Sequence, residues 1–366
     1  MEQTLEETTE YLEKLPWDQI TFPKLGFAFD VKSTAFTLFG FDVKWYGLII
    51  AIGMLLAVIY CFRRMKDFGL DGDKVIDCVM VGLIGAIVCA RLYYVIFNID
   101  QYKDIKSVLS IRNGGLAIYG GLIGAILFGG FMAKKRKVKL LPLLDVASMG
   151  FLIGQGIGRW GNFFNHEAFG SNTSLPWGMS SGRIQNYILN HADEIYNRSG
   201  IVVDPYVAVH PCFLYESLWC LLGVLLLHLY YKKRKYDGEI LLMYSCWYGF
   251  ERMFVEGLRT DSLYIGGVRV SQVLAAVIFA VSLILLIAMR IRIKKKGAPV
   301  LYVNTEESKE MLRRAEEEYK AEEERRKAKK NKTDKTLTAE QRIIDEEPAE
   351  ETDNNTEEEN ENGKAD

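Results

Sequence analysis

The sequence predicts an all-α polytopic membrane protein with about seven transmembrane helices, its N-terminus outside and its C-terminus in the cytoplasm. Three observations lead to this fold class. Seven apolar segments are long enough to cross a bilayer, basic residues cluster in every second connecting loop, and an almost wholly polar tail follows the last apolar segment.

The apolar segments are judged by length. A hydrocarbon core of about 30 Å requires about 20 helical residues. Segments of roughly this length cover residues 45–62, 79–97, 116–132, 140–157, 213–231, 240–255 and 270–289. The fourth contains Asp145 and the sixth contains Glu251 and Arg252, so these two are the weakest predictions.

Basic residues indicate the orientation, because cytoplasmic loops carry an excess of Lys and Arg. Clusters follow the first, third, fifth and seventh segments, whereas the other loops are poor in basic residues. The clusters are Arg63, Arg64, Lys66 and Lys74; Lys134, Lys135, Arg136, Lys137 and Lys139; Lys232, Lys233, Arg234 and Lys235; and Arg290, Arg292, Lys294, Lys295 and Lys296. Seven spans with the N-terminus outside satisfy all four clusters.

Composition divides the chain into an extracytoplasmic segment 1–44, a transmembrane catalytic domain 45–296 and a charged tail 297–366. The tail has 13 Lys and Arg and 22 Asp and Glu, so we expect it to be largely disordered, although the stretch 306–332 favours a helix. The rest of the chain is net positive, which suits anionic lipid head groups. We expect no nucleic-acid partner, and the acidic N-terminus does not fit a cleaved signal peptide.

The insertion 171–209 lies between the fourth and fifth spans, on the outer side of the predicted topology. It is long enough to form a small cap over a site at that face. His166, which precedes it, is predicted to lie at the surface. Residues 27–45 mix aromatic and charged residues, and they fit either a short hairpin or an interfacial element.

Polar and ionisable side chains are expensive inside a bilayer, so they usually mark function or a buried partner. With the orientation above, six of the seven spans bring such residues to the outer leaflet. These residues are Tyr46, Arg91, Tyr119, Arg159, Asn162, His210, Glu216, Tyr248, Arg252, Glu256 and Arg259. The sequence therefore predicts a polar site at the outer leaflet.

Two segments suggest what this site binds. Tyr248, Arg252 and Glu256 are four residues apart, so they share one helix face and Arg252 can pair with Glu256. Arg159 follows glycines spaced four apart over residues 150–158, a face that lets a helix or a lipid chain approach closely. Arginine has a planar fork of donors that suits phosphate. Arg159 and Arg252 therefore predict a clamp for a phospholipid phosphodiester.

Plainer interpretations are also possible. Arg252 and Glu256 fit an ion pair that only holds two helices together, and Glu216 fits the partner of a buried arginine such as Arg91. Buried charges also occur in transporters, but the sequence has no internal repeat and its charges gather at one face. Seven spans with the N-terminus outside also fit a receptor, for which this density of polar residues has no obvious purpose.

A long motif carries a family resemblance. Residues 158–170 match the pattern G-R-x-G-N-F-x-N-x-E-x-x-G throughout. Shorter matches are Trp45-Tyr46-Gly47, Gly114-Gly115, Leu175-Pro176-Trp177, Leu214-Tyr215-Glu216 and Tyr248-Gly249. With these motifs the chain resembles the prolipoprotein diacylglyceryl transferase family over roughly residues 27–292. It departs at Tyr119, where many members have His, and in its charged tail.

The resemblance implies a reaction at the bacterial plasma membrane. A diacylglyceryl group would move from phosphatidylglycerol to the lipobox cysteine thiol of a prolipoprotein, forming a thioether and releasing glycerol phosphate. The partners would be phosphatidylglycerol, prolipoprotein signal peptides with a lipobox, and membrane lipids. No cofactor or metal is expected, because no His, Cys or carboxylate cluster has ligand spacing.

This reaction assigns a role to each candidate residue. We predict that Arg159 and Arg252 clamp the phosphate, that Glu256 orients Arg252, and that Tyr119 lies nearest the thiol. The predicted substrate-binding residues are Tyr46, Asn162, Glu167, His210, Tyr248 and Arg259. The general base stays open among Glu167, His210 and Tyr119 beside an arginine, because a free phenol, with a pKa of about 10, is a poor base.

Overall fold

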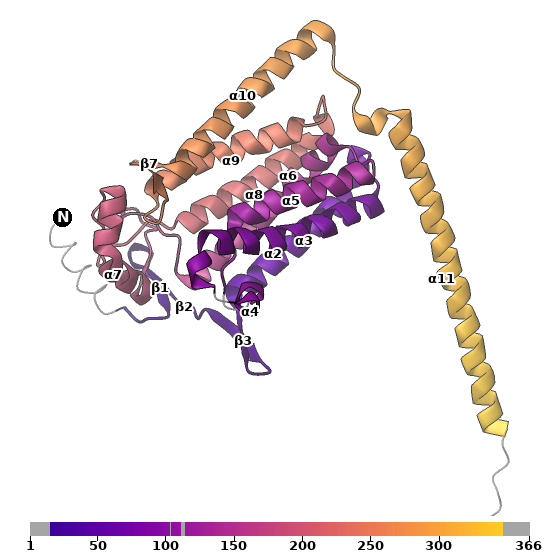
Figure 1. Cartoon of the computed structure of the whole chain (residues 1–366), viewed down its shortest axis with the longest axis horizontal. Coiled ribbons are helices and arrows are strands. Elements are labelled where there is room, and N and C mark those ends of the chain that lie inside the picture. The colour runs from indigo at the N-terminus through magenta and orange to yellow at the C-terminus, as the bar shows by residue number, and fades with distance from the viewer. Residues whose placement is uncertain (1–14, 103, 111–113, 266, 347–366) are drawn as a thin grey trace, which may run out of the picture. The chain divides into compact units, whose positions relative to one another are not determined.

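The computed structural model describes residues 15–102, 104–110, 114–265 and 267–346, and it is mostly helical (Figure 1). Within these described residues, five helices are long and apolar enough to cross a membrane. They are α2 (Trp45–Arg64), α3 (Gly72–Phe97), α6 (Leu140–Asn165), α8 (Cys212–Tyr230) and α10 (Val270–Lys296). The chain is thus a polytopic membrane protein, and it forms two compact units that divide after Leu312.

Two further helices, α5 (Ile118–Lys135) and α9 (Glu239–Leu258), pack within the first unit. Glycines let α5 approach α3 closely. A Cβ on Gly120 would lie 2.4 Å from the carbonyl oxygen of Cys89, and one on Gly124 would lie 2.2 Å from that of Gly85. Helix α9 packs against α6, α8 and α10, and Gly249 meets the backbone of α10.

The prediction of an all-α fold is wrong at one end of the bundle. Strand β1 (Gln19–Phe22) pairs antiparallel with β2 (Phe27–Asp30) and with β5 (Ser180–Ser181), which precedes α7 (Gly182–Ser199). Apolar side chains of β1 and α7 form one buried cluster with Phe213 of α8 and with residues of the intervening loops: Ile20, Val31, Phe169, Met179, Ile184, Ile188, Ile195, Val203, Val209 and Phe213. We call β1, β2, β5 and α7 the cap, and the bundle end beside it the cap end.

The remaining strands are two short hairpins. Strands β3 (Thr34–Leu38) and β4 (Phe41–Lys44) form the hairpin that was one of two interpretations of residues 27–45. Strands β6 (Tyr264–Ile265) and β7 (Val268–Arg269) join α9 to α10. Short 3-10 helices cover Pro23–Leu25, Met65–Phe68, Ile99–Gln101, Tyr231–Lys233 and Tyr302–Asn304.

Arg91 organises the loop between α3 and α5, which contains α4 (Ile105–Leu109). Its guanidinium group is buried and donates five hydrogen bonds of 2.7–2.9 Å to backbone carbonyls. The acceptors are Ser107, Val108, Ser110, Gly114 and Gly115. Because all five of its N–H donors are thereby used, Arg91 is not the partner of Glu216.

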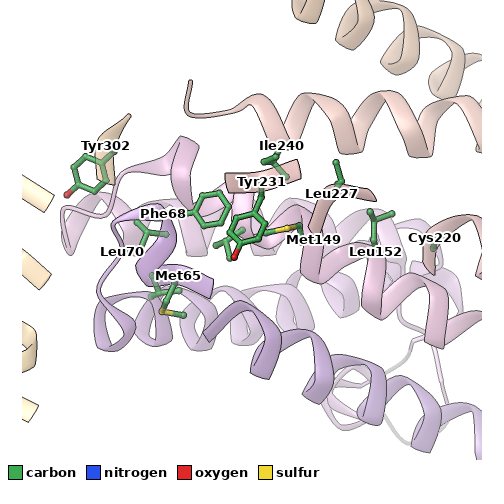
Figure 2. Close-up of a cluster of buried hydrophobic side chains, with 12 residues drawn as sticks. Met65, Phe68, Leu70, Met149, Leu152, Cys220, Leu227, Tyr231, Ile240 and Tyr302 are labelled. Carbon is green, nitrogen blue, oxygen red and sulfur yellow. The ribbon is translucent and has the colours of Figure 1, made fainter. Parts of the chain in front are cut away.

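At the opposite end of the bundle, which we call the tail end, the chain after α10 packs back onto the helices. Tyr302 joins the buried cluster that includes Met65, Phe68 and Tyr231 (Figure 2). Its backbone N–H donates to Asp237 Oδ2 at 2.8 Å, and Ser308 Oγ donates to the Gly69 carbonyl at 3.0 Å. The sequence did not predict this docking.

Helix α11 (Glu306–Glu346) begins in this docked segment, and its residues from 313 onward belong to the second unit. The helix includes the stretch 306–332, whose composition favours a helix. Within it, side chains four residues apart form exposed ion pairs such as Arg326–Glu322 at 2.7 Å and Lys327–Glu323 at 2.8 Å. Such exposed pairs each contribute little stability.

Truncation separates the docked segment from the rest of the tail. Removing residues 297–366 is expected to lower the thermal unfolding midpoint by several degrees, because exposing a buried side chain such as Tyr302 alone costs roughly 2–3 kcal/mol. Removing only residues 313–366 should leave the midpoint nearly unchanged, since the docked contacts of Tyr302 and Ser308 lie before residue 313. Equal midpoints for both truncated chains in the same detergent would contradict this.

Candidate active site

A fully buried carboxylate, Glu216, stands at the centre of the candidate site. Helix α8 begins after Pro211 and carries Glu216 in its first turns, at the cap end. Three arginines from different parts of the chain converge on it. Arg252 Nη1 lies 3.1 Å from Glu216 Oε2, Arg259 Nη1 lies 3.2 Å from Oε1, and Arg159 also pairs with Oε2.

Two of these arginines also form an ion pair with a second carboxylate. On α9, Arg252 Nη2 lies 2.5 Å from Glu256 Oε2, as the four-residue spacing predicts. Arg259 donates through Nε and Nη2 to both oxygens of Asp261, at 2.9 and 2.6 Å. In the described part of the chain, Arg159 forms an ion pair only with Glu216.

The three arginines differ in exposure. The side chains of Arg159 and Arg252 are 20% and 18% exposed, and that of Arg259 is 11% exposed. Arg259 also uses its fork on Asp261. Arg159 and Arg252 therefore keep donors that a ligand can reach, whereas Arg259 mainly neutralises its carboxylate neighbours.

The motif of residues 158–170 forms the end of α6 and the turn after it. The side-chain amides of Asn162 and Asn165 donate to Glu167 Oε1 at 3.0 and 3.2 Å. The Tyr46 ring at the start of α2 lies against Gly161, where a Cβ would be 2.8 Å from the ring. This motif thus places Tyr46, Asn162 and Glu167 next to the α6 turn that follows Arg159.

His210 belongs to a separate hydrogen-bonded chain. Trp177 Nε1 donates to the Tyr215 hydroxyl at 2.8 Å, and that hydroxyl lies 3.1 Å from His210 Nδ1. Since indole only donates, the Tyr215 O–H is free to donate to Nδ1. Burial lowers the pKa of His210 and favours this neutral imidazole.

Gly170, the last motif residue, joins this part of the site to α9. Its N–H donates to the His210 carbonyl at 2.9 Å, and it forms a β-bridge with Arg259. A Cβ on Gly170 would lie 2.8 Å from His210 Cβ and 2.9 Å from Cys212 Sγ. The position has no room for a larger residue.

Comparison with known proteins identifies the family. The family model described as prolipoprotein diacylglyceryl transferase matches residues 33–288. The chain belongs to the prolipoprotein diacylglyceryl transferase family. It is accordingly an enzyme of lipoprotein biosynthesis in the membrane, with prolipoprotein diacylglyceryl transferase activity.

Several relatives named phosphatidylglycerol–prolipoprotein diacylglyceryl transferase support this assignment. The protein of Clostridium novyi (strain NT) is 41% identical over 261 residues, which cover 71% of this chain and 96% of the relative. That of Clostridioides difficile (strain 630) is 40% identical over 244 residues, 66% and 89% of the two chains. That of Bacillus cereus (strain Q1) is 40% identical over 269 residues, 73% and 95% of the two chains.

The structure of this transferase brings some predicted site residues together and not others. Arg159, Arg252 and Arg259 pair with Glu216, and Glu256 pairs with Arg252. Tyr248 lies one turn before Arg252 on α9, and its ring stacks on Tyr244 with the ring centroids 6.0 Å apart. By contrast, Tyr119 is 47% exposed at the start of α5. Among the described contacts, none joins Tyr119 to an arginine.

Sequence reasoning missed two features of the site. Glu216 collects three arginines, although it was considered only as the partner of one. Glu251 was regarded only as a weakness of the sixth span, yet it is a buried carboxylate directly before Arg252. A carboxylate and an arginine at adjacent positions of one span were the available signal.

The prediction that His166 lies at the surface is wrong. Its side chain is buried between α6 and the cap, with Nε2 2.9 Å from the Val31 carbonyl and Nδ1 2.9 Å from Ser181 Oγ. The carbonyl can only accept, so Nε2 carries a proton, and the Ser181 hydroxyl can donate to Nδ1. Ser181 also caps α7 by accepting from the N–H of Ile184 at 3.2 Å.

Acidification is therefore expected to destabilise the cap. Burial lowers the pKa of His166 below its unfolded value of about 6.5. Its contribution to stability is complete above that value and is lost as the pH falls through the lower folded pKa. Between about pH 7 and pH 5, the unfolding midpoint of His166→Asn should fall less than that of the wild type. Equal losses would refute this role.

Among the described residues, no group of three or more His, Cys, Asp or Glu side chains is arranged to hold a metal ion. The polar groups at the cap end are instead guanidinium donors and carboxylates. This donor set suits an anionic ligand with several acceptor oxygens.

Proposed function

We propose that this transferase moves the diacylglyceryl group of phosphatidylglycerol to the lipobox cysteine thiol of a prolipoprotein, at the outer leaflet. The observation that carries the proposal is the pair of partly exposed arginines, Arg159 and Arg252, which meet at Glu216. The names of the relatives give phosphatidylglycerol and prolipoprotein as the substrates of those proteins. The site has the donors that such a lipid requires.

The chemistry explains why the donors must be cationic. The thiolate sulfur attacks the diacylglycerol carbon that carries the phosphate ester, a C–S bond forms and the C–O bond breaks. The electron pair leaves with the oxygen, so the phosphodiester with one negative charge becomes a phosphomonoester with about two. Fixed guanidinium groups in a low-dielectric site stabilise this growing charge more than they stabilise the ground state.

The other residues have supporting roles in this proposal. Asn162, held by Glu167, and Tyr46 at Gly161 form the polar boundary where the glycerol head group sits. Glu256 fixes the fork of Arg252. His210, Tyr248 and Arg259 complete the substrate-binding wall. Tyr119 is an exposed residue of α5, the helix that packs against α3, and no described contact joins it to the arginine cluster.

Space beside Arg159 supports a lipid ligand. Of the glycines on the α6 face, Gly150 packs against Cys61 Sγ, whereas Gly154 and Gly158 have no neighbouring atom within 4 Å of a built Cβ. An apolar chain can therefore lie along the α6 backbone with its phosphate at Arg159. This position would open the site sideways to the bilayer.

Strand pairing supports seven crossings rather than five. Strand β1 precedes α2 and pairs with β5, which follows α6, so both lie on one side of the membrane. Two segments on the same side are separated by an even number of crossings. Helices α2, α3 and α6 supply three crossings between β1 and β5, so α5 must supply the fourth. Gly170, after α6, likewise pairs with Arg259, after α9. Gly170 and Arg259 therefore lie on the same side of the membrane. Because α8 crosses once between them, α9 must cross back.

The direction follows from the basic loops, which all lie at the tail end of the bundle. We place the tail end in the cytoplasm and the cap end outside the bacterial plasma membrane. Residues 45–296 are the catalytic domain, the cap joins the N-terminal segment 1–44 to the insertion 171–209, and residues 313–366 are a cytoplasmic appendage.

Transfer is tested with purified protein in detergent and a lipobox peptide. With phosphatidylglycerol, the peptide should gain one diacylglyceryl group, detected by mass spectrometry. A peptide with Ser in place of Cys should gain nothing, and neither should the Cys peptide with phosphatidylethanolamine as the lipid. Folded protein that never modifies the thiol would overturn the proposal.

A further inference from the structure

Glu251 is a buried carboxylate without a partner. It is 5% exposed, and neither of its oxygens accepts a hydrogen bond within the described part of the chain. Each of the other buried carboxylates among the described residues has an N–H, hydroxyl or arginine partner: Asp145 two backbone N–H groups, Glu216 three arginines, Glu239 Arg290 and Tyr230, and Glu256 an ion pair with Arg252. An unpaired buried carboxylate is costly, so its presence requires an explanation.

The position of Glu251 connects it to the proposed phosphate clamp. It directly precedes Arg252 on α9, the helix that packs against α6, which carries Arg159, and against α8, which carries Glu216. Tyr248, three residues earlier, lies on the same face of α9 as Glu251. The neighbouring surface of α10 at Gly249 is apolar, formed by Ala275 and Phe279. Because Glu251 comes two residues after Gly249, about 200° round the helix, it lies on the side of α9 that faces away from α10, where α9 packs against α6 and α8.

We propose that Glu251 is the catalytic residue that accepts the proton of the lipobox cysteine thiol. This inference rests on the proposed function above. Both oxygens of Glu251 are available to accept the S–H hydrogen bond, and the site that holds the leaving phosphate is adjacent. A base placed there generates the thiolate only where the lipid is bound.

Each charge in this step has a destination. The thiol proton moves to a Glu251 oxygen, the sulfur electron pair forms the C–S bond, and the C–O pair leaves with the phosphate oxygen. Glu251 therefore becomes neutral as the phosphate gains a negative charge. The total charge beside Arg159 and Arg252 stays constant, which avoids an uncompensated charge in a low-dielectric site. The proton then leaves with the phosphomonoester, whose second pKa is about 6.

The three bases considered from the sequence fit this position less well. Glu167 is exposed and already accepts from Asn162 and Asn165. The Nδ1 atom of His210 is engaged with Tyr215. Tyr119 lies on α5, which packs against α3 rather than against the helices of the arginine cluster.

Selenocysteine provides the test, because a selenol ionises at lower pH than a thiol and needs no base. The Glu251→Gln variant keeps the side-chain shape but cannot take the proton. With the cysteine lipobox peptide, kcat should fall about 10²–10⁴-fold. With the same peptide carrying selenocysteine, most of this loss should disappear, so the ratio of selenocysteine to cysteine rates rises well above that of the wild type.

The control is Glu239→Gln, which also removes a buried carboxylate from α9 but at the tail end. Its selenocysteine-to-cysteine ratio should equal that of the wild type. If Glu251→Gln does not fold, Glu251→Asp keeps a displaced carboxylate and should show a smaller rise in the ratio. Equal losses on both peptides, or no loss, would overturn the role of Glu251. A wild type inactive on both peptides would instead overturn the proposed transfer reaction.

Discussion

Replacing Arg159 with lysine is expected to lower the rate of diacylglyceryl transfer about 10²–10³-fold, the usual cost of removing one donor from a developing anion. Arg252→Lys should have a similar effect. Lysine keeps the positive charge but loses the planar fork that lets one side chain contact both Glu216 and a phosphate. The measurement is kcat at saturating phosphatidylglycerol with the lipobox peptide.

Arg136→Lys is the matched control. Arg136 pairs with Asp77 through a half-exposed contact in the loop between α5 and α6, at the tail end. This variant should keep wild-type kcat. If Arg159→Lys and Arg252→Lys also keep near-normal rates, the phosphate clamp is wrong, although the family assignment is unaffected.

The second large effect is expected for Glu216→Gln, which should destabilise the folded state by roughly 3–5 kcal/mol and abolish transfer. The substitution removes the negative charge that three arginines share, and it leaves their guanidinium groups close together and partly buried. Thermal unfolding in detergent measures the first effect, and the peptide assay measures the second.

Glu307→Gln is the comparison for Glu216→Gln. Glu307 pairs with Lys139 at 3.2 Å, but both side chains are about half exposed. Its loss should therefore change the free energy of unfolding by at most about 1 kcal/mol. If Glu216→Gln unfolds at the wild-type temperature, the arginines have other counter-charges and Glu216 is not the centre of the site.

The sequence alone determined the features that depend on local patterns. Apolar segments of bilayer length indicated the five candidate membrane helices, because spanning length follows directly from bilayer thickness. The four-residue spacing of Arg252 and Glu256 correctly placed them in contact on one helix face. The motif of residues 158–170 gave the family, because so long a pattern rarely arises by chance.

Only the tertiary structure decided which distant residues meet. Glu216 had several arginines of equal charge available, and helix packing gave it Arg159, Arg252 and Arg259 while Arg91 turned to five backbone carbonyls. The pairing of β1 with β5 joins segments about 160 residues apart, and two-residue strands leave no periodic signal.

The docking of Tyr302 and the isolation of Glu251 share this cause. The sequence around Tyr302, a single aromatic residue in a charged tail, does not show whether its side chain is exposed or buried. In the same way, the sequence around Glu251 does not show whether this carboxylate is exposed, paired or buried without a partner. The state of each residue depends on the shape and charge of surfaces built by helices far away in the chain. Local pattern thus determined the spans and the family, and long-range packing determined the site.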